Sequence, residues 1–274
     1  MNTREIKLIV SDIDGTILDD THQIDPNLQQ VLQRLKERKI PFVLASARSP
    51  KGMQHLAEAL GISEYPLACY NGALVLANGN LSAPPISSHE VAIKEVVRII
   101  SETRAHFPQV SINLYSGKVW YVDRLDEWVK KEAAITGEVP QEADLLALVQ
   151  SLQIPVHKLL LIGTSAEIQK VKGYWEKRSL KTSALYLSKD NYLEVTHREV
   201  SKEKALMELA SYYNVPLAQT LAIGDNFNDL PMILKAGVGV AMANAPRRVR
   251  EQADAVTLSN NESGVGAALQ KFVL

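Results

Sequence analysis

Cysteine is nearly absent from this sequence, since Cys69 is the only one among 274 residues. A chain with one cysteine cannot form an internal disulfide, which excludes the small disulfide-stapled secreted domains. A chain without disulfides is typical of a reducing compartment, so we expect a cytoplasmic protein. Cys69 lies in an apolar run, which favours a packed core residue over a nucleophile.

Long hydrophobic runs and net charge are also missing. No apolar run approaches the roughly 20 residues of a membrane-spanning helix, and residues 1–7 are too polar to begin a secretory signal. The 30 basic and 31 acidic residues give a formal net charge of −1. We therefore expect neither a membrane nor a nucleic acid as a partner. The six histidines show no metal-ligand spacing, which disfavours a zinc site.

The sequence does contain enough apolar residues, 46% of the chain, for one large domain or two smaller ones. The apolar run at 6–10 ends abruptly at Asp12-Ile13-Asp14-Gly15-Thr16. Such a run indicates a buried strand whose carboxyl end opens at a sheet edge, where open α/β sheets bind ligands. We therefore predict that two carboxylates face one crevice. Taken alone, these five residues also fit a solvated acidic turn.

Strand and helix patterns alternate on either side of this segment. Apolar runs at 40–45 and 67–70 predict further buried strands, and apolar residues at helical spacing predict the helices between them. We expect Asp25 to cap the first helix, with Pro26 as its first residue, and the second helix to begin near Pro50. This alternation is typical of a parallel sheet, which strands near the end of the chain would complete.

A change of pattern at the Pro84-Pro85 pair indicates a second domain inserted into the first. Residues 83–187 predict a mixture of amphipathic helices and hairpins that differs from the alternation around it. We therefore predict an α/β protein with a parallel-sheet core, residues 1–82 and 188–274, and an inserted α/β (α+β) domain. Residues 192–195 are expected to lead back into the core.

Polar residues follow three of the predicted core strands. These residues are Asp12 and Asp14, then Ser46, then Asp225, Asn228 and Asp229. Because the carboxyl ends of parallel strands meet at one edge, we expect these distant residues to share one crevice. Two like charges about 4 Å apart repel by roughly 4 kcal/mol at an effective dielectric of 20, so four carboxylates need a cation. Oxygen ligands without histidine or cysteine favour Mg²⁺, which often also binds substrate phosphate.

These residues resemble the four motifs of the haloacid dehalogenase superfamily phosphatases, in the same order. The motifs are Asp12-Ile13-Asp14-Gly15-Thr16, Ser46, Lys202 and Gly224-Asp225-x-x-Asn228-Asp229. Asn71-Gly72-Ala73, Ala241-Met242-Ala243-Asn244-Ala245 and the insertion between the second and third motifs are similar to the Cof-type (subclass IIB) sugar phosphatases. The resemblance covers both ends of the chain and is only architectural within the insertion.

The resemblance implies a Rossmann-like core, a mobile cap domain and Mg²⁺-dependent hydrolysis of small phosphate monoesters. Asp12 would be the nucleophile that forms an aspartyl-phosphate. Asp14 would be the general acid and base, for which the site must raise its pKa above the usual value of about 3.9. Ser46 and Lys202 would bind the phosphoryl oxygens. Sugar phosphates are the first expected substrates, and nucleotides, flavin mononucleotide and pyridoxal phosphate are alternatives.

The resemblance also implies a metal site. Asp12, Asp225 and the main-chain carbonyl of Asp14 would bind Mg²⁺, and Asn228 and Asp229 would hold or orient that shell. Asn228 is also a candidate for binding substrate.

Three positions leave alternatives open. Ser46-Ala47-Arg48 stands where the family often has Thr-Gly-Arg, and Arg48 could bind substrate phosphate or form an interdomain salt bridge. Asn71 could position substrate or shape a turn. Of Lys202 and Lys204 we expect Lys202 to point inward, because it lies nearer the start of its helix. Candidates for substrate selection on the cap are Asn113, Tyr115, His157 and Lys158.

Competing functions are a receiver-like phospho-aspartate signalling domain, a phosphomutase or phosphotransferase of the same superfamily, and a dinucleotide binder. Asp14 and the long insertion argue against the receiver. The glycines Gly237 and Gly239 suggest the dinucleotide binder weakly, because the third glycine of that fingerprint is missing. Nothing in the sequence indicates an oligomeric state.

Overall fold

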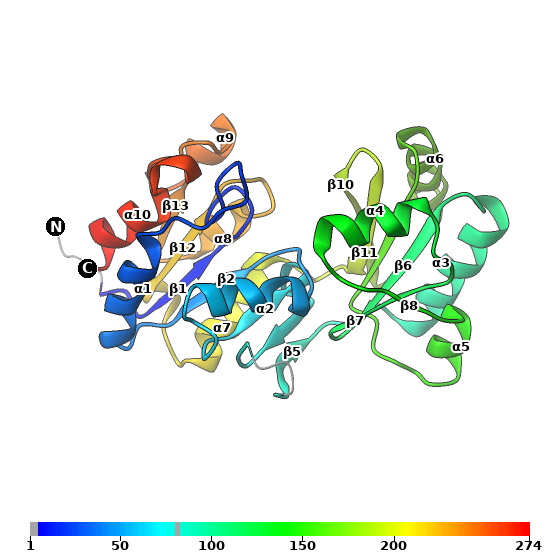
Figure 1. Ribbon diagram of the computed structural model, residues 1–274, viewed down its shortest axis with the longest axis horizontal. Helices are drawn as coiled ribbons and strands as arrows, with labels where there is room; N and C mark the ends of the chain where they lie inside the picture. The colour runs from blue at the N-terminus through cyan, green and yellow to red at the C-terminus, as the bar shows by residue number, and fades with distance from the viewer. Residues whose placement is uncertain (1–4, 80–82) are drawn as a thin grey trace. The chain divides into compact units, whose positions relative to one another are not determined.

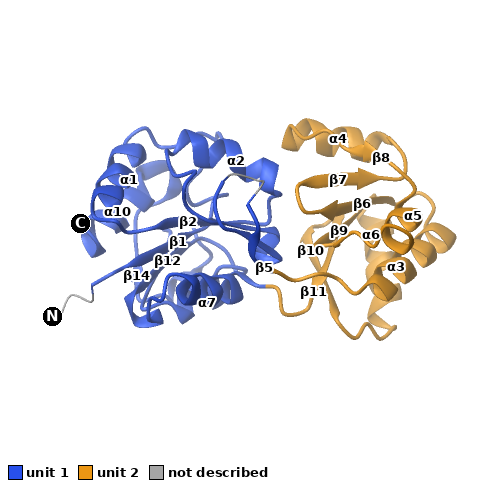
Figure 2. Cartoon of the chain, turned by 90° about the horizontal axis from the view of Figure 1, so that it is seen from below, with its two compact units in different colours: residues 1–87, 201–274 blue, residues 88–200 orange. Residues whose placement is uncertain are grey.

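The computed structural model describes residues 5–79 and 83–274, and the chain divides into two compact units (Figure 1, Figure 2). The first unit comprises residues 1–87 and 201–274, and the second comprises residues 88–200. The second unit therefore begins and ends later along the chain than the range 83–187 expected from the sequence.

An eight-stranded sheet forms the centre of the first unit, in the order β14-β13-β12-β1-β2-β3-β4-β5. The strands are β1 (Leu8–Ser11), β2 (Phe42–Ala45), β3 (Leu67–Cys69), β4 (Leu74–Leu76), β5 (Pro85–Ser88), β12 (Thr220–Gly224), β13 (Val238–Ala241) and β14 (Ala255–Val256). Strand β1 pairs in parallel with both β2 and β12, and parallel pairing continues outward to β3 and to β13 and β14. The predicted parallel sheet is confirmed, and the carboxyl ends of β1, β2 and β12 open at one edge.

Helices cover both faces of this sheet. They are α1 (Leu28–Glu37), α2 (Pro50–Ala59), α7 (Lys202–Tyr212), α8 (Leu230–Lys235), α9 (Arg247–Arg250) and α10 (Gly264–Phe272). Figure 2 shows α1, α2 and α10 on one side of the sheet and α7 on the other. All four residues of β1 are buried, as expected for a strand covered on both faces.

The first helix begins later than the sequence predicted. Helix α1 starts at Leu28, with Asn27 as its N-cap, so the prediction of Asp25 as cap and Pro26 as first residue is wrong. The Asp25 carboxylate instead accepts a hydrogen bond from the Asn27 N–H at 2.9 Å, and its carbonyl accepts one from the Leu28 N–H at 3.0 Å. These bonds close a turn that precedes the helix.

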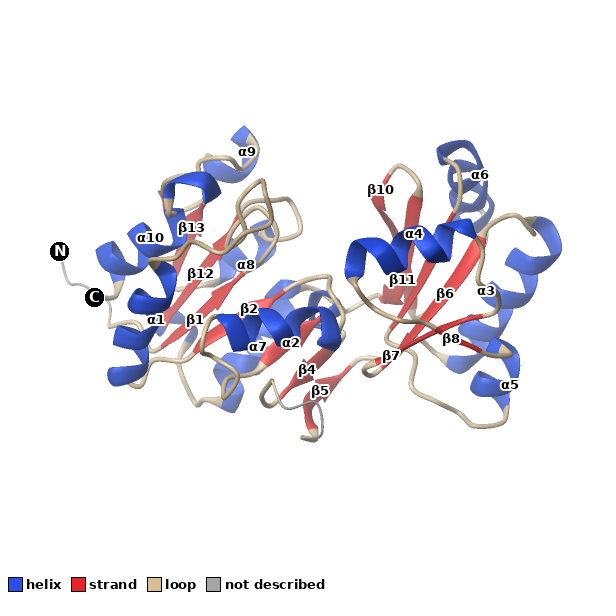
Figure 3. Ribbon diagram, in the orientation of Figure 1, coloured by secondary structure: helices blue, strands red, loops and turns tan. Residues whose placement is uncertain are grey.

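The second unit has its own six-stranded sheet, in the order β10-β11-β9-β6-β7-β8, drawn in red in Figure 3. Its strands are β6 (Ser111–Ser116), β7 (Val119–Val122), β8 (Gln141–Glu142), β9 (Lys158–Ile162), β10 (Ser183–Lys189) and β11 (Tyr192–His197). Its helices are α3 (Ile93–His106), α4 (Glu127–Thr136), α5 (Leu145–Gln150) and α6 (Ser165–Glu176). Side chains of α3, α5 and α6 form an apolar core with one face of the sheet.

The sequence predicted that residues 192–195 lead back into the first unit, and this prediction is wrong. Strand β11 lies in the second sheet. It pairs antiparallel with β10 and with β9. Leu193 and Val195 enter the apolar core of the second unit, while the Tyr192 hydroxyl donates to the Glu132 carboxylate of α4 at 2.6 Å. Successive side chains of β11 thus contact opposite sides of the second sheet, and both sides belong to the second unit. For this reason the second unit includes β11 and extends to residue 200.

No helix among the described residues combines the length and the apolar character that crossing a bilayer requires.

Candidate active site

Three carboxylates meet at the carboxyl edge of the first sheet. Asp12 directly follows β1, Asp225 directly follows β12, and Asp229 directly precedes α8. One oxygen from each lies within 4.8 Å of the others. Because β1 and β12 are neighbours in parallel, residues more than 200 positions apart come together, as the order of the strands requires.

Lys202 supplies a positive charge inside this cluster. It is the first residue of α7, its side chain is 1% exposed, and its ammonium donates to Asp12 Oδ1 and, at 2.5 Å, to Asp229 Oδ1. The Ser201 hydroxyl caps the helix by accepting a hydrogen bond from the Lys204 N–H at 3.1 Å. With the helix start fixed in this way, Lys202 points into the cluster and Lys204 is only half-buried.

Three carboxylates share one lysine, and the pKa values of two of these carboxylates are raised. Burial, and then the charge of Asp229, raises the pKa of Asp12 well above its usual value, and the same two causes raise the pKa of Asp225. Burial alone would lower the pKa of Lys202, but Asp12 and Asp229 outweigh it, so this pKa is raised and the ammonium stays charged. Three acids against one lysine leave an excess of negative charge that suits a bound cation.

Both oxygens of Asp229 have partners within the protein. Oδ1 contacts Lys202, and Oδ2 accepts hydrogen bonds from the N–H groups of Asp225 at 3.0 Å and Asn226 at 2.9 Å. Gly224 permits this arrangement, because a Cβ at that position would lie 2.4 Å from the Cβ of Asp229. Asp229 therefore fixes the loop that carries Asp225 and orients Lys202.

The loop after Asp12 closes over Asp225. Thr16 Oγ1 donates to Asp225 Oδ1 at 2.9 Å, and the Asn244 side chain donates to the carbonyl of Gly15 at 2.8 Å. Gly15 has a φ of +81°, and a Cβ there would lie only 2.6 Å from Asp225 Oδ2. Thr16 and Asn244 were expected only as members of two family motifs, and their contacts with Asp225 and Gly15 were not predicted from the sequence. Asn244 follows β13, which pairs in parallel with β12, and this position alone could have predicted that Asn244 lies near the carboxylate cluster.

Asp14 is not one of the three clustered carboxylates, and its side chain pairs with Arg48. Arg48 Nε donates to Asp14 Oδ2 at 2.9 Å, and Nη2 donates to Oδ1 at 2.6 Å. This contact uses both carboxylate oxygens, an arrangement that fixes geometry as well as charge. Arg48 was expected on substrate phosphate or in an interdomain salt bridge, and its pairing with Asp14 was not foreseen.

Ser46, Asn71 and Asn228 link three loops beside the cluster. Ser46 is buried directly after β2, and its hydroxyl accepts a hydrogen bond from the Arg48 N–H at 3.2 Å. The Ser46 carbonyl accepts one from the Asn71 N–H at 2.8 Å. Asn71 has a left-handed φ of 57°, and its side-chain oxygen lies 3.5 Å from Asn228 Nδ2. The structure thus places these predicted residues at the same edge as Asp12.

The residues proposed for substrate selection all have partners within the second unit. The Asn113 side chain accepts from Trp120 Nε1 and donates to the Leu160 carbonyl, both at 3.0 Å. Lys158 Nζ lies 3.6 Å from a Glu194 oxygen and 4.8 Å from the centre of the Tyr115 ring. These contacts give Asn113, Tyr115 and Lys158 a structural role, and His157 likewise accepts a hydrogen bond from the Gly117 N–H at 3.0 Å.

Comparison with known proteins identifies relatives along nearly the whole chain. The sequence model of a family described as haloacid dehalogenase-like hydrolase matches residues 9–269. A Haemophilus influenzae protein named "Putative phosphatase" is 34% identical over 266 residues, covering 97% of both chains. The Bacillus subtilis 5-amino-6-(5-phospho-D-ribitylamino)uracil phosphatase is 26% identical, covering 98% of this chain and 97% of its own.

A solved structure is similar over the same extent. The crystal structure of a haloacid dehalogenase-like hydrolase from Bacteroides thetaiotaomicron has 31% sequence identity and a TM-score of 0.87. The match covers 97% of this chain and 99% of that one.

Proposed function

The chain belongs to the haloacid dehalogenase-like hydrolase family, and from that premise we propose that it is a Mg²⁺-dependent phosphatase acting through a phosphorylated Asp12. Its substrates are small phosphate monoesters, with sugar phosphates as the first class to test. The observation that carries the proposal is the cluster of Asp12, Asp225 and Asp229 around the buried Lys202. Membership of a hydrolase family also argues against a receiver-like signalling domain.

The donor set of the cluster fits Mg²⁺. Its side-chain ligands are carboxylate oxygens, and burial together with mutual repulsion raises the pKa of two of them. Asp12 and Asp225 would hold the ion, with the Asp14 carbonyl as a further candidate ligand, and Asn228 and Asp229 would orient that shell. When bound, Mg²⁺ would supply positive charge to the carboxylates and to the phosphoryl oxygens.

Asp12 is the proposed nucleophile. Its carboxylate oxygen would attack phosphorus, the bond from phosphorus to the ester oxygen would break, and the aspartyl-phosphate would form. A water molecule would then attack the same phosphorus, which releases inorganic phosphate and regenerates the carboxylate. Lys202 holds the Asp12 carboxylate in a fixed orientation before the reaction, which lowers the entropic cost of attack.

Asp14 is the proposed general acid and base. It would protonate the leaving ester oxygen in the first step and accept a proton from the attacking water in the second. Arg48 is a positioning residue for this role, because its two hydrogen bonds fix the direction of the Asp14 carboxylate. Gly15, with its left-handed backbone, lets the chain turn directly after Asp14.

The phosphoryl group would be bound by the residues that surround Asp12. Lys202 carries the only ammonium that contacts the cluster within the described part of the chain, and Ser46 brings a buried hydroxyl from the end of β2. Asn71 and Asn228 add amide groups at the same edge. A phosphoryl transition state spreads its charge over three oxygens, so several such donors contribute together.

The second unit is proposed as a cap that selects the substrate and excludes water. It is inserted between two segments of the first unit and has its own sheet and apolar core. The B. subtilis relative acts on a phosphorylated ribityl compound, which supports the class of small phosphate esters.

The test is a panel of sugar phosphates, nucleotides, flavin mononucleotide and pyridoxal phosphate, assayed with Mg²⁺ and with EDTA. We expect several esters to be hydrolysed with Mg²⁺, none with EDTA, and none by Asp12→Asn. Reaction in ¹⁸O-labelled water separates hydrolysis from a phosphomutase, because only hydrolysis puts ¹⁸O into the released phosphate. Measurable turnover by pure Asp12→Asn would refute the role of Asp12 as the nucleophile.

A further inference from the structure

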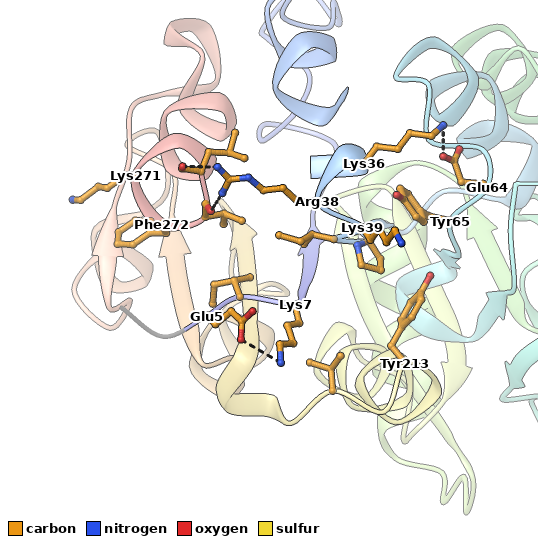
Figure 4. Close-up of a pocket in the computed structure, with 16 residues that line it drawn as sticks. Glu5, Lys7, Lys36, Arg38, Lys39, Glu64, Tyr65, Tyr213, Lys271 and Phe272 are labelled. Atoms are coloured by element: carbon orange, nitrogen blue, oxygen red, sulfur yellow. Dashed lines mark hydrogen bonds and ion pairs between the residues drawn. The ribbon is translucent and has the colours of Figure 1, made fainter. Parts of the chain in front are cut away.

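A cavity of about 1130 Å³ lies at the end of the first sheet that is opposite the candidate active site (Figure 4). Lys7 and Pro41 line it and directly precede β1 and β2, whereas Asp12 and Ser46 directly follow the same strands. The length of the strands therefore separates the cavity from the carboxylate cluster. The proposed phosphatase mechanism uses none of its residues.

The wall of this cavity carries more positive than negative charge. The lining includes five basic residues and two acidic ones: Lys7, Lys36, Arg38, Lys39 and Lys271 against Glu5 and Glu64. Lys36 pairs with Glu64, and Lys7 Nζ lies 3.3 Å from a Glu5 oxygen. Among the described residues, Lys39 and Lys271 have no acidic partner within 4.0 Å. The cavity thus keeps cationic groups that no carboxylate of the described chain neutralises.

Two tyrosines add neutral donors to the same wall. Tyr65 comes from the loop after α2, Tyr213 follows α7, and Figure 4 shows both reaching the cavity together with Lys39. Burial raises the pKa of both phenols, so their hydroxyls remain protonated near neutral pH. Neither hydroxyl hydrogen-bonds to any other described residue. Ile40 and Phe272 contribute apolar surface beside these donors.

We propose that this cavity binds a small phosphorylated organic molecule at a second site, distinct from the catalytic one. The phosphate oxygens would accept hydrogen bonds from the Lys39 ammonium and from the hydroxyls of Tyr65 and Tyr213. The organic part would pack on Ile40 and Phe272. Ammonium and hydroxyl donors match a phosphate, and a concave wall with apolar surface suits a small molecule.

Lys39 offers a sharp test because of its backbone. Its φ of 58° lies in the left-handed region just after α1, where glycine is favoured and other residues cost on the order of 1 kcal/mol. Lys39→Gly therefore removes the ammonium and relieves the backbone at once. A loss of binding in this variant cannot be ascribed to unfolding if its thermal stability rises.

The experiment measures binding of trinitrophenyl-ATP by fluorescence, in EDTA so that no metal assists the catalytic site. We expect saturable binding to the wild type, at least about tenfold weaker binding to Lys39→Gly with an increased melting temperature, and several-fold weaker binding to Tyr213→Phe. Lys177→Gln, which removes an exposed lysine of the second unit, is the charge-matched control and should bind within about twofold of the wild type. ADP should displace the probe.

Three results would overturn the proposal. One is equal binding by the wild type, Lys39→Gly and Tyr213→Phe, and another is no saturable binding by the wild type. The third is displacement by inorganic phosphate as effectively as by ADP, which would mean that the organic part contributes nothing. Phosphatase activity with Mg²⁺, measured on the same proteins, should be unchanged in Lys39→Gly and reports on the catalytic site separately.

Discussion

Lys202 decides the charge balance of the carboxylate cluster. Its buried ammonium contacts both Asp12 and Asp229. We expect Lys202→Met to lower the free energy of unfolding by about 3 kcal/mol, because it leaves buried carboxylates without their counter-charge. Urea denaturation of the metal-free protein measures this. Lys204→Met is the matched control and should change stability by less than about 0.5 kcal/mol.

A double variant tests the physical reason for that loss. Adding Asp12→Asn to Lys202→Met removes one of the uncompensated carboxylates, so part of the lost stability should return. A double variant that is less stable than Lys202→Met would show that packing of the lysine stem, and not charge, dominates.

Gly15 lies at a position that does not accommodate a side chain. A Cβ there would meet Asp225 Oδ2 at 2.6 Å, and the φ of +81° disfavours any side chain. Gly61 has a similar φ of +69° but open space around it. We expect both Gly15→Ala and Gly61→Ala to lose about 1 kcal/mol of stability through the backbone. Only Gly15→Ala should also weaken Mg²⁺ binding, measured by calorimetry, and equal Mg²⁺ affinity in both variants would contradict the close contact.

At the scale of elements, His157 connects β9 to the turn between β6 and β7. Its Nδ1 accepts a hydrogen bond from the Gly117 N–H at 3.0 Å, and its Nε2 lies 3.0 Å from Ser88 Oγ. Burial, followed by the charge of His89, lowers the pKa of His157 from 6.5 to about 4. The imidazole is therefore neutral in the folded protein, with its proton on Nε2.

The pH dependence follows from this shift. Between pH 6.5 and about 4 the unfolded chain binds a proton that the folded chain does not. The stability due to neutral His157 is thus complete above pH 6.5 and falls as the pH drops toward 4, by about 3 kcal/mol at most. His157→Gln should show a flatter decline in denaturation experiments across this range. An identical decline in both proteins would contradict the lowered pKa.

Strands and helices whose apolar residues recur at regular spacing could be predicted from the sequence. Side-chain contacts between loops could not. Strand β1 and the positions of Asp12 and Asp225 follow from apolar runs that end in acids. The prediction for strand β11 was wrong, because the turn residues Asp190 and Asn191 join it to β10 as a hairpin of the second sheet. The pairing of Arg48 with Asp14 depends on the side-chain directions of two loops, which no spacing in the sequence reveals.

The whole molecule should gain stability from the metal that the cluster is proposed to bind. An ion that binds only the folded state at one hundred times its Kd adds about 2.7 kcal/mol. For a chain of this size that corresponds to a rise in melting temperature of roughly 5 °C. Differential scanning calorimetry with Mg²⁺ and with EDTA should show this rise in the wild type. Asp225→Asn is expected to lose it, and a rise of equal size in that variant would place the ion elsewhere.

Direct detection of the phosphorylated residue tests the central claim most sharply. The protein is mixed with a hydrolysed ester and Mg²⁺, quenched in acid within milliseconds, digested and analysed by mass spectrometry. We predict one phosphorylated peptide, with the phosphoryl group on Asp12 and sensitive to hydroxylamine, and none when Mg²⁺ is replaced by EDTA. A phosphoryl group on another residue, or rapid turnover with no phosphorylated Asp12 at any quench time, would contradict the account.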